Sequence, residues 1–176
     1  MNTAEFKETQ GFRLWWAWAA VIALNFLFLY AIIQQVILGI PFGNRPASNI
    51  ILFLLQFLTL LLLAFLFAIK LTTSVTDEGI RYRFYPFQLK STLIEWSELS
   101  DAYMREYNSF YEYGGWGIRV GSQKNNRAIN TTASGREGLQ LDFKDGSLLL
   151  IGTAKPAELK RVIDLHISAG KIKWGT

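Results

Sequence analysis

The chain has 176 residues, of which 51% are hydrophobic, and a formal net charge of +4. It contains no cysteine, which excludes disulfides, thiolate nucleophiles, iron–sulfur clusters and cysteine-based zinc sites. His166 is the single histidine, so sites built from several imidazoles are excluded too. From residue 71 onward there are 14 Lys+Arg and 12 Asp+Glu, which is too balanced for the basic face of a nucleic-acid-binding domain. We expect no nucleic-acid partner and no cofactor.

Two long apolar stretches lie near the N-terminus, and no charged residue occurs in residues 14–44 or 46–69. After a polar segment at 1–13, we expect a first transmembrane helix at 14–38, a link at 39–49 and a second transmembrane helix at 50–69. At 1.5 Å per residue these helices would be about 37 and about 30 Å long, enough to cross a bilayer. The first stretch is too long and too bulky for a cleaved signal peptide, whose apolar core has about 7–15 residues.

A few side chains within these stretches are amphipathic or polar. Tryptophan favours the headgroup level of a membrane, so Trp15, Trp16 and Trp18 are expected at the membrane interface. The polar residues could bond within the hairpin or to a second copy, or they could form a polar track. None is ionisable, so an ion or proton path is not expected. These polar residues are Asn25, Gln34, Gln35, Gln56 and Thr59.

The distribution of cations around the two stretches predicts their orientation. The link at 39–49 carries one cation, Arg45. Cytoplasmic flanks usually carry the excess of Lys and Arg. We therefore expect a multi-pass membrane protein with both termini in the cytoplasm and the link outside. The cations of the outer flanks are Lys7, Arg13, Lys70, Arg81 and Arg83.

Residues 71–176 are expected to form a cytoplasmic, mainly β domain. Apolar and polar residues alternate there, as in Ile80, Tyr82 and Phe84, which share one face of a strand. Turn signals at 77–79 and 144–147 separate such segments, and the second predicts a hairpin. Seven or eight short antiparallel strands at this spacing indicate a barrel or sandwich. The expected strands are residues 71–75, 80–85, 91–96, 99–107, 116–120, 127–131, 139–143 and 147–152.

One helix is expected to close the domain, starting at Pro156 and stopping before Gly170. Leu159, Val162, Ile163, His166 and Ile167 follow helical spacing and form one apolar stripe that should lie against the strands. His166 on this stripe is expected to pack and not to bind a metal.

Five segments and the order of elements carry a family resemblance; the segments are residues 94–99, 115–119, 135–141, 145–153 and 155–159. In these features the chain resembles bacterial membrane proteins that carry two spans and a pleckstrin-homology-like (PH-like) domain, a family without an assigned activity. The resemblance implies an antiparallel barrel of about seven strands closed by a C-terminal helix, and a location in the bacterial inner membrane. It supplies no catalytic residues. In one respect the sequence differs from phosphoinositide-binding PH domains, because residues 76–79 are acidic where those domains have a basic loop.

The segment 107–136 combines aromatic residues, glycines and cations. Such a combination could hold a peptide, lipid headgroups or a small ligand. It could also be a long hairpin whose aromatics lie on the domain or the membrane. As exposed contact residues we expect Tyr113, Trp116, Arg119 and Arg127.

The preferred hypothesis is a non-enzymatic interaction module that binds a protein partner or a lipid surface at the cytoplasmic membrane face. One alternative is a small-ligand receptor or enzyme that uses residues 107–136 and a deep pocket near Arg119. Another is a structural subunit or homo-oligomer of a membrane complex, with Asn25, Gln34 and Gln56 as its contact face.

Overall fold

The computed structural model describes residues 5–121, 125–131 and 135–171. The chain forms two compact units. One is a helical hairpin of residues 14–68, and the other is a β unit that combines residues 1–13 with residues 69–176.

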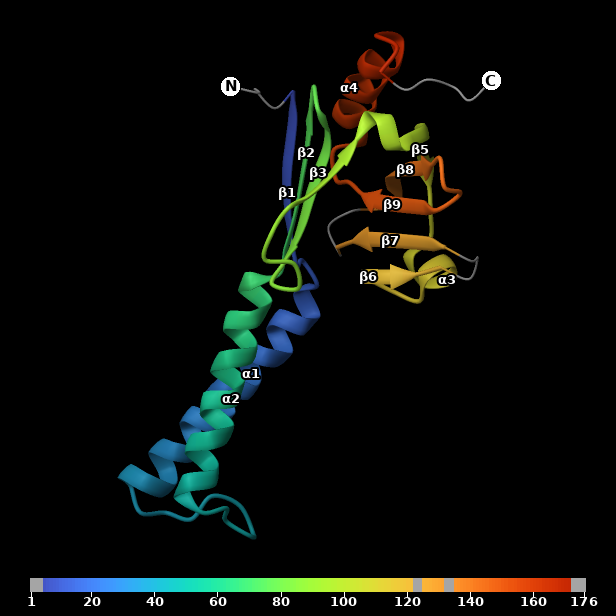
Figure 1. The fold of residues 1–176 in the computed structure, drawn as a ribbon. Coiled ribbons are helices and arrows are strands. Elements are labelled where there is room, and N and C mark those ends of the chain that lie inside the picture. Colours follow the sequence, from blue (N-terminus) through green and yellow to red (C-terminus); the bar gives the residue numbers. More distant parts are fainter. Residues whose placement is uncertain (1–4, 122–124, 132–134, 172–176) are drawn as a thin grey trace. The chain divides into compact units, whose positions relative to one another are not determined.

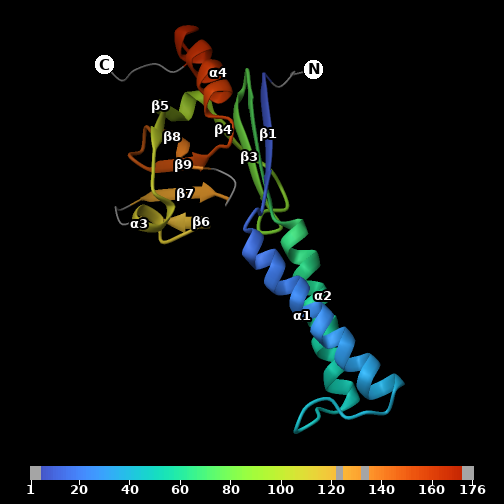
Figure 2. The same cartoon turned by 180° about the vertical axis from the view of Figure 1, so that it is seen from behind.

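The hairpin unit consists of two antiparallel apolar helices, which lie side by side in Figures 1 and 2. Helix α1 (Trp15–Ile32) continues through one π-helical turn, η1 (Ile33–Ile37), and helix α2 is Asn49–Ala68. The continuous helix Trp15–Ile37 has 23 residues and α2 has 20, so both are long and apolar enough to cross a membrane. The prediction of two such helices is confirmed.

The first sheet of the β unit has four antiparallel strands in the order β1-β2-β3-β4 (Figures 1 and 2). The strands are β1 (Phe6–Gly11), β2 (Lys70–Thr76), β3 (Gly79–Tyr85) and β4 (Thr92–Glu95). The last three match predicted strands, whereas β1 was not predicted. Phe6, Glu8 and Gln10 share the inward face of β1, and two of these three are polar, so hydrophobic alternation is absent there.

The second sheet has five strands in the order β5-β8-β9-β7-β6. They are β5 (Leu99–Glu106), β6 (Gly117–Val120), β7 (Asn126–Asn130), β8 (Glu137–Phe143) and β9 (Leu148–Gly152). The predicted β8–β9 hairpin is confirmed. The prediction that all strands are antiparallel is wrong for one pair: β9 lies between β8 and β7, and β7 runs parallel to β9.

The predicted closed barrel is replaced by these two sheets, and no strand pairing joins them within the described residues. The chain passes from β4 to β5 through a 3₁₀ turn, η2 (Trp96–Glu98). Glu95 and Glu98 cap this turn reciprocally, since the Glu98 carboxylate accepts a hydrogen bond from the Glu95 N–H at 3.1 Å. The capped turn redirects the chain from one sheet into the other.

One hydrophobic core lies between the two sheets and helix α4 (Pro156–Ser168), which was predicted. Its apolar stripe is buried, including Leu159 and Ile163. His166 packs as expected: its side chain is buried, its ring lies 4.8 Å from that of Trp96, and Nε2 lies 2.9 Å from Glu5 Oε2.

Buried hydrogen bonds fasten the edge strand β1 to the chain that follows β9. The Glu8 carboxylate is buried and accepts from Thr153 Oγ1 at 2.7 Å and from the Ala154 N–H at 3.0 Å. Gln10 Nε2 donates to the Gly152 carbonyl at 2.8 Å. Glu8 and Gln10, whose polarity prevented the prediction of β1 from the sequence, therefore attach this strand to the rest of the fold.

Candidate interaction site

Strands β5 and β6 are connected by the short helix α3 (Ser109–Tyr113). The Asn108 side chain caps it, because Oδ1 accepts from the N–H groups of Phe110 at 3.0 Å and Tyr111 at 3.2 Å. Gly114 ends the helix with φ of 68°, a left-handed conformation that favours glycine. This local sequence places a small, well-capped helix beside the second sheet.

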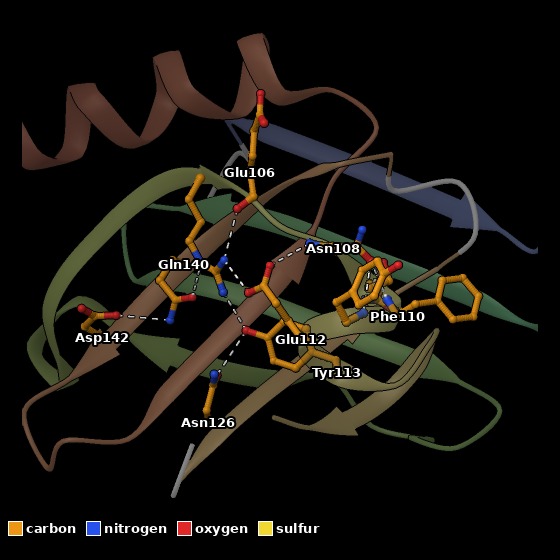
Figure 3. A network of polar contacts seen from close by, with 12 residues as sticks. Glu106, Asn108, Phe110, Glu112, Tyr113, Asn126, Gln140 and Asp142 are labelled. Atoms are coloured by element: carbon orange, nitrogen blue, oxygen red, sulfur yellow. Dashed lines mark hydrogen bonds and ion pairs between the residues drawn. The ribbon is translucent and has the colours of Figure 1, made fainter. Parts of the chain in front are cut away.

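Arg105 on β5 is the centre of a polar network. Figure 3 labels its partners Glu112, Tyr113 and Gln140. Arg105 Nη1 donates to Glu112 Oε2 at 2.8 Å, and its Nη2 donates to the Tyr113 hydroxyl at 2.8 Å. Its Nε donates to Gln140 Oε1 on β8 at 3.0 Å. The Tyr113 hydroxyl in turn donates to Asn126 Oδ1 on β7 at 3.3 Å. The network thus connects α3 to three strands of the sheet, β5 and β8 through Arg105 and β7 through Tyr113.

Burial and neighbouring groups shift the pKa values of two ionisable residues in this network, Arg105 and Asp142. Partial burial would lower the pKa of Arg105, but the hydrogen bond and charge of Glu112 outweigh it together with Tyr113, so the pKa is raised. Partial burial raises the pKa of Asp142, although the hydrogen bond from Gln140 acts in the opposite direction. The network therefore positions α3, and its guanidinium is already neutralised by Glu112.

The prediction that Tyr113 is exposed is wrong, because only 4% of its surface is accessible. Its hydroxyl is engaged by Arg105, and its ring meets that of Tyr107 edge to face at 6.3 Å. Together with Ala128 and Leu150, these tyrosines form a second small core under α3. Tyr113 supports the surface and is not part of it.

The other three predicted contact residues lie at or near the surface. Trp116 is half-buried, with its ring edge to face against Phe110 at 4.7 Å. Arg119 is exposed on β6, and its Nε donates to the Trp116 carbonyl at 2.9 Å. Arg127 is exposed on β7 and lies opposite Val120 in the ladder. The structure thus brings Trp116 and Arg119 together.

Four exposed apolar residues around them were not predicted as contacts. Tyr111 is 90% exposed and Val120 is 73% exposed, and Phe110 and Ile118 are exposed as well. Strand β6 is the last strand of its sheet, and Ile118, Arg119 and Val120 are exposed on both of its faces. The sequence did carry a signal for this surface. It was a short apolar strand next to glycines, in which neither face is marked as the buried one. We call Phe110, Tyr111, Ile118, Arg119 and Val120 the α3–β6 patch.

In the described part of the β unit, grooves lie along and beside α4. One of about 390 Å³ is lined by Met104, Glu106, Glu137 and Lys160, among others. Its charges are of both signs and give no clear preference for an anion or a cation. Within the described ranges, no cluster of three His, Asp or Glu side chains could hold a metal ion.

In the hairpin unit, the polar residues bond to one another. Asn25 Nδ2 donates to the Thr59 carbonyl at 3.3 Å, and Asn25 Oδ1 accepts from Gln56 Nε2 at 3.0 Å and from Thr59 Oγ1 at 3.2 Å. Near the link, Gln35 Nε2 donates to the Ala47 carbonyl at 2.7 Å and to Asn49 Oδ1 at 2.8 Å. The expectation of hydrogen bonding within the hairpin is confirmed for these residues.

No protein-family model matches this chain, and neither a curated protein nor a solved structure matches it.

Proposed function

We propose that this protein is a membrane-anchored interaction module whose β unit is a variant of the PH-like architecture and presents the α3–β6 patch to a protein partner. The hairpin would cross the bacterial inner membrane, with the β unit at its cytoplasmic face. The observation that carries the proposal is the exposed apolar edge strand β6 beside the exposed aromatics of α3.

Membrane insertion is supported by the surface of the hairpin. Apolar side chains such as Phe57 and Leu58 are largely exposed, whereas Asn25 and Thr59 are turned towards each other. A helix that is apolar all round is stable where its surroundings are apolar, as in lipid. The single cation of the link, Arg45, against five on the flanks supports a cytoplasmic β unit.

The chemistry of the α3–β6 patch suits a protein partner. An edge strand offers unpaired backbone N–H and C=O groups, and an extended peptide can pair with them as an additional strand. Exposed Tyr and Phe side chains supply the aromatic anchors that are enriched at protein interfaces, and Arg119 adds a charged contact. The Arg105 network keeps α3 in place before binding, which lowers the entropy cost of association.

The test is mild-detergent purification of the full chain from native membranes after crosslinking, followed by identification of the copurifying proteins. A stoichiometric partner should be lost from a Tyr111→Ala/Val120→Lys variant. The matched control is Leu165→Ala, which changes an exposed apolar residue on α4 outside the patch. Retention of the same partner by the patch variant, with an unchanged far-UV spectrum, would refute the α3–β6 patch as the binding surface.

A further inference from the structure

One end of the first sheet is continuous with both hairpin helices along the chain. The ladder aligns Gly11 with Lys70 and Lys70 with Tyr85 at this end. Helix α2 ends at Ala68, two residues before Lys70, and α1 begins at Trp15. Paired residues stand opposite each other in adjacent strands, so Lys70 and Tyr85 lie at the same end of the sheet. The loop after Tyr85 therefore leaves the sheet at the end where the chain enters it from α2.

That loop, residues 86–91, exposes large apolar side chains. Leu89 is 75% exposed and Phe87 is 61% exposed. The loop is nevertheless firmly built: the Gln88 N–H donates to the Phe84 carbonyl at 2.7 Å, and Gln88 Oε1 accepts from the Phe84 N–H at 3.1 Å. The Phe87 ring is stacked on the buried Phe84 ring at 5.4 Å. These apolar groups are displayed by a defined turn.

Charge is separated along the strands of the same sheet. Residues 9–16, 69–76 and 82–94 contain no Asp or Glu. Lys70, Arg83 and Lys90 are exposed there and form no ion pair with the described part of the chain. Apart from the buried Glu8 in the middle of β1, the acidic residues of this sheet gather at its opposite end, in and beside the β2–β3 turn, where Arg81 pairs with Glu78. They are Glu5, Asp77, Glu78 and Glu95.

From these observations we infer that loop 86–91 is a lipid-contact element for an anionic membrane surface. Phe87 and Leu89 enter the boundary between headgroups and acyl chains, and Lys70, Arg83 and Lys90 bind the anionic headgroups. The inference rests on the proposed membrane insertion of α1 and α2. Interfacial segments that bind anionic lipid combine apolar side chains, which enter the bilayer, with neighbouring cations, which contact the headgroups. The opposite, acidic end of the sheet would be repelled by such a surface.

The natural absence of cysteine allows site-specific labels in the full chain. Leu89→Cys, Glu78→Cys and Leu58→Cys would each carry an environment-sensitive fluorophore in vesicles of phosphatidylcholine and phosphatidylglycerol. Lipids that carry a nitroxide at a shallow or at a deep position of the bilayer would quench the fluorophores that lie at that depth. We expect the label at 89 to be quenched by the shallow nitroxide, the label at 58 by the deep one, and the label at 78 by neither.

The same labels separate this inference from the proposed membrane anchor. If 58 is quenched but 89 responds like 78, the anchor stands and the lipid-contact element is refuted. If 58 is not quenched either, the anchor itself fails. If the fluorophore at residue 89 reports an apolar environment only when another protein is added, the loop binds a protein partner. This result would also overturn the inference.

The role of charge has its own test. Replacing Lys70, Arg83 and Lys90 by Gln should weaken binding of the labelled loop to the bilayer. We expect the equilibrium constant for this contact, measured from quenching of the label at residue 89, to fall roughly fivefold for each cation removed, and added salt should lower it too. Lys155→Gln/Lys160→Gln, which changes exposed cations at α4, is the control and should have no effect. Equal quenching in vesicles of pure phosphatidylcholine would exclude recognition of anionic headgroups.

Discussion

The hairpin unit and the β unit distribute polar and apolar side chains in opposite ways. In the β unit, Leu139 and Leu141 are fully buried. In the hairpin, Leu58 is 61% exposed, while Asn25 and Thr59 bond to each other between the helices. Globular proteins in water bury their apolar residues, and membrane spans must satisfy their polar groups internally. The contrast supports the proposed insertion of the hairpin into a membrane, with the β unit in water.

The largest expected effect comes from making the same substitution in both units. Leu141→Ala should lower the free energy of unfolding of the β unit by about 3 kcal/mol, because it leaves a cavity in the core. Leu58→Ala should change it by less than about 0.5 kcal/mol, since Leu58 lies outside that unit. Urea unfolding in detergent, followed by near-UV circular dichroism, measures both. Equal losses would contradict the separation into two units.

The buried carboxylate of Glu8 tests how the β unit recruits its first strand. Glu8→Ala leaves the Thr153 hydroxyl and the Ala154 N–H without their acceptor and should cost about 2 kcal/mol. Glu8→Gln should cost less, because an amide oxygen can still accept. Lys7→Ala, at an exposed neighbouring position, is the control. Hydrogen exchange of β1 amides would show whether this strand opens first, and unchanged protection would argue against the role of Glu8.

In the hairpin, a polar side chain should take the part that apolar packing has in the β unit. Asn25→Leu removes the hydrogen bonds to Gln56 and Thr59 and should weaken helix association by about 1 kcal/mol. Forced-separation measurements in bilayers can detect this change. Leu61→Ala, an exposed apolar position, serves as the control. Stabilisation by Asn25→Leu would show that these bonds do not hold the hairpin together.

The smallest effect is a pH dependence confined to the β unit, since residues 14–44 and 46–69 carry no charged side chain. Burial raises the pKa of Asp142 above its ordinary value of 3.8, so ionisation is less favourable in the folded state. The stabilising contribution is present below pH 3.8 and is lost as the pH rises through the raised pKa. Relative to Asp142→Asn, wild-type stability should fall across this window in urea titrations. A rise would contradict the assigned direction.

Local patterns in the sequence predicted most of the fold. Apolar runs predicted both hairpin helices, alternation predicted β2 to β9, and the spacing of Leu159, Val162 and Ile163 predicted the buried face of α4. Strand β1 was missed because its inward residues Glu8 and Gln10 are polar and are satisfied by residues more than 140 positions away. The parallel β7–β9 pair and the two-sheet arrangement depend on long-range pairing, which periodicity does not encode.

The candidate site was predicted in part. The segment 107–136 does carry exposed aromatics and cations, and Trp116 and Arg119 do lie together. Composition could not show that Tyr113 points inward, because this follows from Arg105 on β5, a cation that the sequence did not single out. Nor could it show that β6 ends its sheet, which is what leaves Ile118 and Val120 uncovered.

The most direct measurement is the labelling of single cysteines in the full chain from each side of the bacterial inner membrane with a membrane-impermeant maleimide. The two variants are Asn44→Cys, in the link, and Tyr111→Cys, at an exposed position of α3. If the hairpin crosses the membrane as proposed, residue 44 reacts in intact spheroplasts and residue 111 reacts only in inverted vesicles. Reaction of both residues from the same side, or loss of the protein from membranes at alkaline pH, would contradict the membrane-anchored module.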